Sequence, residues 1–190
     1  LRAQRPLART LPHPAGQASV RRLAADAVVL LHNFRPGVAE RLGIGYESLR
    51  KLRPELVYVA VTGFGNEGPY AQKSAWDNVV QAFAGVAHSQ ADAETGEPTP
   101  YYQIFADKVT ALTAAQAIGA ALFARERGAG GQEIRLAMID AVAAFLWPDT
   151  CGGAAFLERD GILEGQSLAK GNRLVRFRDG WAQIAPTDDS

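Results

Sequence analysis

The sequence predicts an α/β fold built on a mainly parallel sheet with flanking helices, and two observations support this prediction. First, three short runs at residues 27–31, 56–61 and 132–138 have the apolar or alternating character of strands. The first two are continuous and rich in valine, which is typical of strands buried on both faces of a parallel sheet. Second, helical spacing lies between the runs, and such alternation of strand and helix favours a parallel sheet.

The N-terminal half contains two predicted strands, each followed by a loop with glycine. Residues 1–20 show no clear period and are predicted to be a poorly patterned segment. The strand at 27–31 ends at a Pro-Gly turn within residues 32–37, and the strand at 56–61 ends at the glycine-rich loop 62–69. Because ligands bind beyond the carboxyl ends of parallel strands, we expect both loops to face one crevice.

The C-terminal half is predicted to contain a long helix, a third strand and a hairpin. The long helix follows Asp107, carries an apolar stripe and ends at Gly128 after a run of charged residues. Asp77 and Asp140 are predicted to cap two further helices. Residues 175–184 contain an Arg-Asp-Gly turn and predict a β-hairpin.

Composition excludes several classes of partner and site. The 20 Lys and Arg residues balance 20 Asp and Glu residues, so no net charge draws the chain to nucleic acid or to an anionic membrane. No apolar run approaches the roughly 20 residues that a membrane span needs. Cys151 is the only cysteine, which excludes an internal disulfide and fits a reducing, cytoplasmic setting. The 3 histidines have no metal-ligand spacing, so no metal site is predicted.

A Gly-Gly-Gln string at residues 130–132 also occurs in peptide-release factors. Here it lies between a predicted helix and a predicted strand, in a chain without net charge. We therefore interpret it as a connecting turn and reject a release-factor function.

The two crevice loops offer groups that suit a nucleotide. Asn33, Phe34 and Arg35 supply an amide, an aromatic face and a guanidinium, which can hold an adenine ring and a phosphate. Arg41 adds a second cation. A loop with a solvated arginine is the alternative interpretation. In the second loop, the glycines of residues 63–65 let the backbone approach a ligand, although a turn without function explains them equally well.

Asp107 has two interpretations at the start of the long helix. Most aspartates in such positions are N-caps. The same helix N-terminus also favours the anionic carboxylate, and an ionised carboxylate can attack an activated acyl group. Chemistry alone leaves both interpretations open.

Five ordered motifs resemble the family III CoA-transferases, which include formyl-CoA and carnitine-CoA transferases. Residues 32–43 resemble the family's ENFRPG and ERLG segments, and residues 61–70 resemble its SGFGQ-GPY loop. Residues 105–107 resemble the segment that carries the catalytic aspartate. Residues 124–141 resemble the run from ARERTGRGQ to LLDA, and residues 178–188 resemble the strand pair that begins the smaller domain.

The resemblance implies that Asp107 is the nucleophile of a CoA-transferase. Its carboxylate would attack an acyl-CoA thioester, form a mixed anhydride and then an aspartyl-CoA thioester, from which CoA passes to an incoming carboxylic acid. Coenzyme A would be substrate and product, with no need for ATP or a metal. The resemblance assigns the nucleotide end of CoA to Asn33, Phe34, Arg35 and Arg41, a phosphate contact to Lys73, and oxyanion donors to the loop with Gly63, Phe64 and Gly65.

The resemblance also implies the domain organisation. Residues 21–150 would form a large Rossmann-like CoA-binding domain, preceded by the poorly patterned segment 1–20. Residues 151–172 would be a linker, and residues 173–190 the start of a smaller α+β domain. Family members form homodimers of interlocked rings and extend beyond both ends of this chain, which is therefore expected to be a partial chain.

Two alternatives remain open. An α-methylacyl-CoA racemase shares the fold and the CoA site, but moves a proton with a His-Asp pair near the position of Trp76 and Asp77. Indole has no usable base at neutral pH, so Trp76 favours CoA transfer. The other alternative is an inactive CoA-binding fragment, against which the intact Asp107 argues. The sequence does not name the acyl donor or acceptor.

Overall fold

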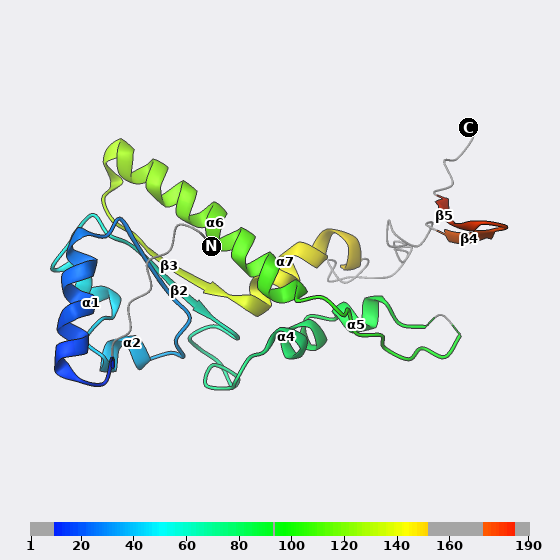
Figure 1. The fold of residues 1–190 in the computed structure, drawn as a ribbon, viewed down its shortest axis with the longest axis horizontal. Coiled ribbons are helices and arrows are strands. Elements are labelled where there is room, and N and C mark those ends of the chain that lie inside the picture. Colours follow the sequence, from blue (N-terminus) through cyan, green and yellow to red (C-terminus); the bar gives the residue numbers. More distant parts are fainter. Residues whose placement is uncertain (1–9, 93, 152–172, 185–190) are drawn as a thin grey trace, which may run out of the picture. The chain divides into compact units, whose positions relative to one another are not determined.

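The computed structural model describes residues 10–92, 94–151 and 173–184 of the chain (Figure 1). The chain forms two compact units, residues 1–142 and residues 143–190. The predicted linker, apart from its first residue, lies outside the described residues, and the predicted domain bounds stay predictions.

A parallel three-stranded sheet forms the centre of the first unit. Its strands are β1 (Val29–His32), β2 (Val57–Thr62) and β3 (Glu133–Ala137), in the order β1-β2-β3. Val59 of β2 pairs with Leu31 on one side and with Ile134 on the other. The three predicted strands and their parallel direction are therefore confirmed, with ends that differ by one or two residues.

Helices cover both faces of this sheet. The described helices are α1 (Pro14–Asp26), α2 (Val38–Arg41), α3 (Tyr46–Arg50), α4 (Asp77–Phe83), α5 (Val86–Ser89), α6 (Phe105–Ala124) and α7 (Met138–Thr150). The last turn after α6, Arg125–Ala129, is wider than an α-helical turn and contains Gly128 at φ 92°. None of the described helices combines the length and the apolar character that crossing a bilayer requires.

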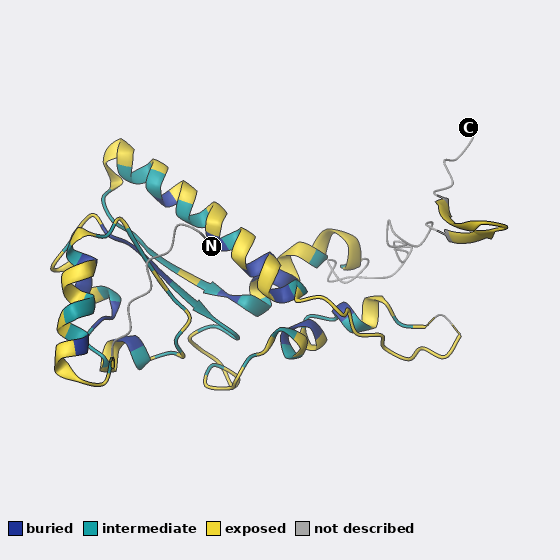
Figure 2. Ribbon diagram, viewed as in Figure 1, coloured by how far each residue is buried: buried dark blue, intermediate teal, exposed yellow. Residues whose placement is uncertain are grey.

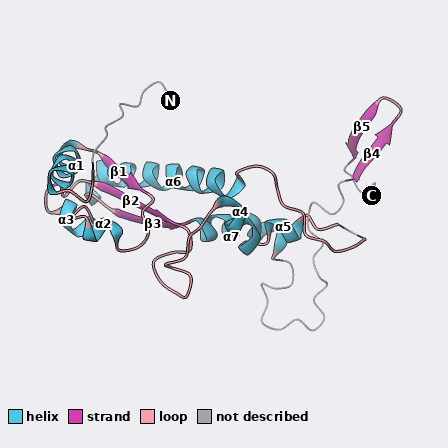
Figure 3. Cartoon of the chain, turned by 60° about the horizontal axis from the view of Figure 1, so that its bottom comes forward, coloured by secondary structure: helices cyan, strands magenta, loops and turns pink. Residues whose placement is uncertain are grey.

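Alternate residues of β2 pack against different helices. Val57 and Val59 are fully buried and lie with Ala121 of α6 on one face of the sheet. Tyr58 lies on the other face, in a cluster that α1, α2 and α3 complete. The buried members of that cluster are Ala24, Ala39, Ile44, Leu49, Leu56 and Tyr58. Figures 1 and 3 show α6 along one face and α1 to α3 along the other, and Figure 2 shows buried residues where they meet the sheet.

Helix α1 begins at Pro14, within the segment 1–20 for which the sequence predicts no element. The Nδ1 atom of His13 accepts a hydrogen bond from the Ala15 N–H at 3.2 Å and so caps the helix. Pro14 has the φ that the first helical turn requires. Histidine is not among the usual N-cap residues, so Pro14 is the one familiar sequence signal at this helix start.

Gly131 lies where two backbone segments touch. Its N–H donates to the Pro54 carbonyl at 3.1 Å, and the Tyr58 N–H donates to the Gln132 carbonyl at 2.8 Å. A Cβ atom at Gly131 would overlap with the Pro54 oxygen. The Gly-Gly-Gln string is thus a connecting turn that passes closely over the start of β2, as the sequence predicts.

His32 connects the end of β1 to the buried cluster. Its Nδ1 accepts a hydrogen bond from the Phe34 N–H at 3.1 Å, so the ring proton must be on Nε2. Nε2 lies 2.8 Å from the Tyr58 hydroxyl, which donates to the Ile44 carbonyl at 3.2 Å. Burial lowers the pKa of His32, although the nearby Glu40 carboxylate acts in the opposite direction. The neutral imidazole therefore fixes the first residues of the loop after β1.

The second unit contains a β-hairpin. β4 (Arg173–Phe177) pairs antiparallel with β5 (Gly180–Ile184), and Phe177 faces Gly180 across the turn. The predicted hairpin is confirmed.

Two Gly→Ala variants test the close approach at residue 131. Gly131→Ala should lower the free energy of unfolding, because the methyl group would overlap with the Pro54 carbonyl. Gly119→Ala is the matched control, since Gly119 lies in α6 and a Cβ atom added there would meet no other atom within 4 Å. Alanine should stabilise that helix by about 0.5–1 kcal/mol. Urea unfolding measures both, and a stabilised Gly131→Ala variant would contradict the packing.

His32 should make the protein less stable in mild acid. Its pKa is lowered in the folded state, so the unfolded chain takes up a proton first as the pH falls below about 6.5. The free energy of unfolding should therefore decrease from pH 7 to pH 5 (about the range of histidine titration). His32→Gln should reduce this dependence, whereas His88→Gln, at an exposed position, should keep it. Identical pH profiles of wild type and His32→Gln would contradict the prediction.

Candidate active site

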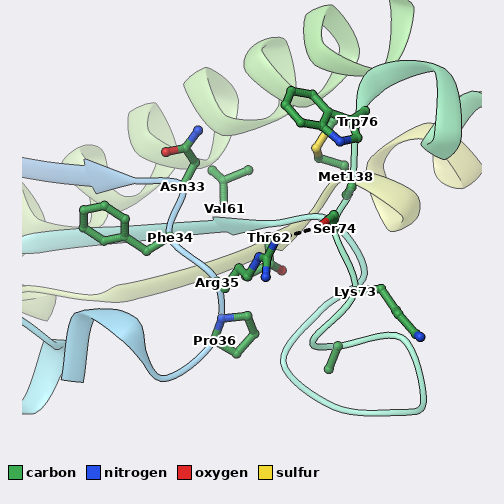
Figure 4. Close-up of a pocket in the computed structure, with 13 residues that line it drawn as sticks. Asn33, Phe34, Arg35, Pro36, Val61, Thr62, Lys73, Ser74, Trp76 and Met138 are labelled. Carbon is green, nitrogen blue, oxygen red and sulfur yellow. Dashed lines mark hydrogen bonds between the residues drawn. The ribbon is translucent and has the colours of Figure 1, made fainter. Parts of the chain in front are cut away.

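The loops after the three parallel strands converge on one hollow of about 200 Å³ (Figure 4), here named the Arg35 hollow. Asn33 follows β1, Gly63 follows β2, and Met138 follows β3. The expectation that both crevice loops face the same site therefore agrees with the geometry. The Arg35 hollow is lined by Asn33, Phe34, Arg35, Pro36, Val61, Thr62, Gly63, Ala71, Lys73, Ser74, Ala75, Trp76 and Met138.

Arg35 ties the loop after β1 to the segment before α4. Its Nη2 atom donates to the Ser74 hydroxyl at 2.5 Å, and Figure 4 shows the two side chains directed toward each other. Lys73 lines the same hollow, with its amine directed away from Arg35. Arg35 and Lys73 are both exposed, and each can bind an anion such as a phosphate.

Gly63 is required by a close approach of two loops. A Cβ atom there would overlap with the Cβ of Ala75, in the segment that carries Ser74 and Trp76. Gly65 has φ 84°, and its N–H donates to the Thr62 hydroxyl at 3.1 Å. The Gly65 amide already has an acceptor, so this geometry does not favour its predicted role as an oxyanion donor.

Phe64 and Arg41 lie outside the Arg35 hollow. The Phe64 ring packs against Tyr70 and Phe83, with ring centroids 5.7 and 5.2 Å apart. Arg41 is exposed at the end of α2, where its guanidinium lies beside Gly37. The structure thus brings Asn33, Phe34, Arg35, Lys73 and Gly63 together, but not Arg41, Phe64 or Gly65.

A second hollow of about 650 Å³, here named the Asp107 hollow, adjoins the first. It shares Asn33, Val61 and Met138 with the Arg35 hollow. Its lining residues are mostly apolar and come from β1 and the residue after it, β2, α6 and the start of α7: Leu31, His32, Asn33, Val61, Asp107, Thr110, Ala111, Ala114, Ala115, Ile118 and Met138. Asp107 therefore lies in a hollow next to the one that contains Arg35 and Lys73.

Asp107 lies inside α6, so the prediction that it precedes the helix is wrong, and the N-cap interpretation of Asp107 is excluded. The helix begins at Phe105 with Ile104 at the cap position, so Asp107 is in the first turn. Its carboxylate still benefits from the helix N-terminus. Even so, burial and then the nearby Asp77 carboxylate raise the pKa of Asp107.

The backbone N–H of Asp107 finds its hydrogen-bond acceptor on another helix, α4. The Asp107 N–H donates to Oδ2 of Asp77 at 2.9 Å, although the two residues are 30 positions apart. Gln81 donates to Oδ1 of Asp77 and also, at 2.8 Å, to the Gln103 carbonyl. Asp77 is the first residue of α4, with Trp76 at the cap position, so the predicted cap of its own helix is wrong.

Asp140 also differs from its predicted role. Helix α7 begins at Met138, directly after β3, which places Asp140 in the first turn instead of at the cap.

Among the described residues, no group of three or more His, Cys, Asp or Glu side chains is arranged to hold a metal ion.

Comparisons with known proteins agree on one family. The model of the family described as CoA-transferase family III matches residues 2–190. The chain is 37% identical over 145 residues to the succinate–glutarate CoA-transferase of Agrobacterium fabrum, covering 76% of this chain and 36% of that protein. It is 39% identical over 125 residues to the acetyl-CoA:oxalate CoA-transferase of Acetobacter aceti, covering 65% of this chain and 32% of that protein.

Solved structures show the same relationship. A CAIB/BAIF family protein from Brucella suis superposes with a TM-score of 0.76 at 30% identity, covering 90% of this chain and 46% of that one. A hypothetical protein from Mycobacterium tuberculosis superposes with a TM-score of 0.69 at 33% identity, covering 74% and 40%. The chain spans about a third of the length of the curated relatives it matches (36% and 32%). The chain therefore belongs to CoA-transferase family III.

Proposed function

We propose that the protein transfers coenzyme A from an acyl-CoA thioester to a carboxylic acid, with Asp107 as the nucleophile. The observation that carries this proposal is that the two hollows share three lining residues, Asn33, Val61 and Met138. The Arg35 hollow offers cations for an anionic ligand, and the hollow next to it is lined by Asp107. Family membership supports the reaction class, because the relatives are named as CoA-transferases.

The proposed reaction begins with attack by an Asp107 carboxylate oxygen on the thioester carbonyl carbon of the donor. The carbon–sulfur bond breaks, CoA leaves as the thiolate, and a mixed anhydride remains on Asp107. The thiolate then attacks the aspartyl carbonyl carbon and releases the donor as a carboxylate. An aspartyl-CoA thioester results. The acceptor carboxylate attacks the carbonyl carbon of this thioester, which releases the CoA thiolate and forms a second anhydride. The thiolate then attacks the acceptor's carbonyl carbon, which releases the new acyl-CoA and restores the Asp107 carboxylate.

The proposed CoA contacts are residues that line the Arg35 hollow. Asn33 and Phe34 would hold the nucleotide, and Arg35 with Lys73 would hold its phosphates. Arg41 is proposed only for an outer phosphate, because it lies beside Gly37. The Gly63 loop is the proposed source of oxyanion donors.

Proton transfer by a racemase is less well supported by this site. Trp76 lines the Arg35 hollow and carries no base that works at neutral pH. His32 lines the Asp107 hollow, but both of its ring nitrogens already take part in hydrogen bonds. Asp107 would therefore lack the imidazole partner that a two-base proton transfer uses.

We also propose that the active protein is a homodimer of interlocked chains, as the family resemblance implies. The β4–β5 hairpin is proposed to begin the smaller domain. The mass of the protein in solution tests the homodimer.

Asp107→Asn should lower kcat by about three orders of magnitude or more while leaving CoA affinity nearly unchanged. The raised pKa of Asp107 means that its charge is unfavourable in the fold, so the variant should unfold at an equal or higher temperature. Asp26→Asn, at the exposed end of α1, is the matched control and should keep wild-type turnover. Steady-state kinetics with pairs of acyl-CoA and carboxylic acid measure the effect.

Trapping with hydroxylamine complements the kinetics. Incubation with a donor acyl-CoA should yield a hydroxamate at Asp107 in the wild type and none in Asp107→Asn. Normal turnover by Asp107→Asn would show that the proposed mechanism is wrong.

Arg35→Met should raise the KM for acyl-CoA by about tenfold or more, because a charge-assisted contact to phosphate is lost. The difference in KM between the variant and the wild type should be smaller at high salt, because salt already weakens the wild-type contact. Arg22→Met, on the exposed side of α1, is the matched control for loss of a surface charge. An unchanged KM in Arg35→Met would remove Arg35 from the CoA site.

A further inference from the structure

We propose that Asp77 is a positioning residue for the nucleophile: from α4, its carboxylate fixes the first turn of α6 and places a negative charge beside Asp107. This inference rests on the proposed function and adds a residue to it. The carrying observation is the hydrogen bond from the Asp107 N–H to Asp77 Oδ2 at 2.9 Å.

The geometry of Asp77 is fixed on both of its oxygens. Oδ2 accepts from the backbone of α6, and Oδ1 accepts from Nε2 of Gln81, one turn further along α4. Gln81 is only 5% exposed, and its amide also donates to the Gln103 carbonyl just before α6. Asp77 and Gln81 thus form a clamp between α4 and the start of α6, two helices that pack together (Figure 1).

Capping of its own helix, α4, does not account for the position of Asp77. Helix α4 has Trp76 at its cap position, and no side chain caps it. Ile104, at the cap position of α6, cannot accept a hydrogen bond from the helix with its side chain. Asp77 satisfies an N–H of the first turn of α6, and it does so at the residue whose carboxylate is the proposed nucleophile.

The second consequence is electrostatic. A neighbouring carboxylate repels the ionised form of Asp107, and Asp77 contributes to the raised pKa of Asp107 after burial. This repulsion exists in the resting enzyme and disappears when Asp107 becomes a neutral anhydride or thioester. Asp77 therefore favours the covalent intermediate relative to the free carboxylate. The same repulsion makes Asp107 harder to ionise at acid pH.

The other charged or titratable groups near Asp107 are few in the described part of the chain. Lys108 follows it on α6, where its Nζ donates to Gln103 Oε1 at 3.3 Å. His32 at the end of β1 lines the same hollow, and burial lowers its pKa. Neither residue is bonded to Asp77, so a substitution there changes one charge without disturbing those contacts.

Asp77→Asn removes the charge with little change in shape, although an amide nitrogen replaces one of the two accepting oxygens. Loss of the neighbouring charge should shift the acid limb of kcat/KM to lower pH, because Asp107 ionises more easily. Glu47→Gln is the matched control: it removes an exposed acid from the first turn of α3, and its limb should stay at the wild-type pH. An acid limb at the same pH in wild type, Asp77→Asn and Glu47→Gln would overturn the proposal.

Asp77→Ala tests the positioning part. It should lower kcat by roughly 10-fold to 100-fold through misplacement of the nucleophile, with CoA affinity unchanged. A purely structural role would lower the unfolding temperature of both variants without moving the acid limb.

Carbon NMR of labelled aspartates tests the electrostatic part without turnover. The titration of Asp107 should move to lower pH in Asp77→Asn than in the wild type, because the neighbouring negative charge is lost. An Asp107 titration at the same pH in both proteins would overturn the proposal, whether or not Asp107 is the nucleophile. Conversely, full turnover by Asp107→Asn would refute the proposed function while this shift still stood.

Discussion

Parallel pairing of β1, β2 and β3 is the constraint on which the rest of the site depends. Because the three strands run in one direction, their carboxyl ends lie at one edge of the sheet, and the segments that follow converge there. Asn33, Gly63 and Met138 reach the same hollow for this reason. The burial of Tyr58 on one face and Val59 on the other fixes the pairing, since a slip of one residue would exchange them.

The electrostatics of Asp107 combine two opposing demands. A carboxylate must be ionised to attack a thioester, and the first turn of α6 favours that form. The largely apolar walls of its hollow and the Asp77 carboxylate disfavour it and raise its pKa. The negative charge of Asp107 is unfavourable in the fold, and the proposed acylation of Asp107 would remove it. Stability and proposed reactivity are therefore coupled at this residue.

Much of the fold is local and could be predicted from the sequence, whereas the contacts that shape the site are not local. Strand runs and the Arg-Asp-Gly turn carry their own pattern, so the sheet and the hairpin were predictable. The contact of Asp77 with Asp107 joins residues 30 positions apart, and no sequence pattern encodes it. The approach of Gly63 to Ala75 is similar. Arg41 lies outside the hollow because α2 turns its side chain toward Gly37, a direction that a motif does not specify.

The central claim is that Asp107 carries the acyl group and then CoA covalently, and transfer of heavy oxygen tests it most directly. In the proposed exchange, the acceptor carboxylate leaves one of its oxygens on Asp107 when the second anhydride is cleaved by the CoA thiolate. After turnover with an acceptor labelled with heavy oxygen, mass spectrometry should find the label in the peptide that contains Asp107. Product formation with no label at Asp107, or with label on another residue, would contradict this account.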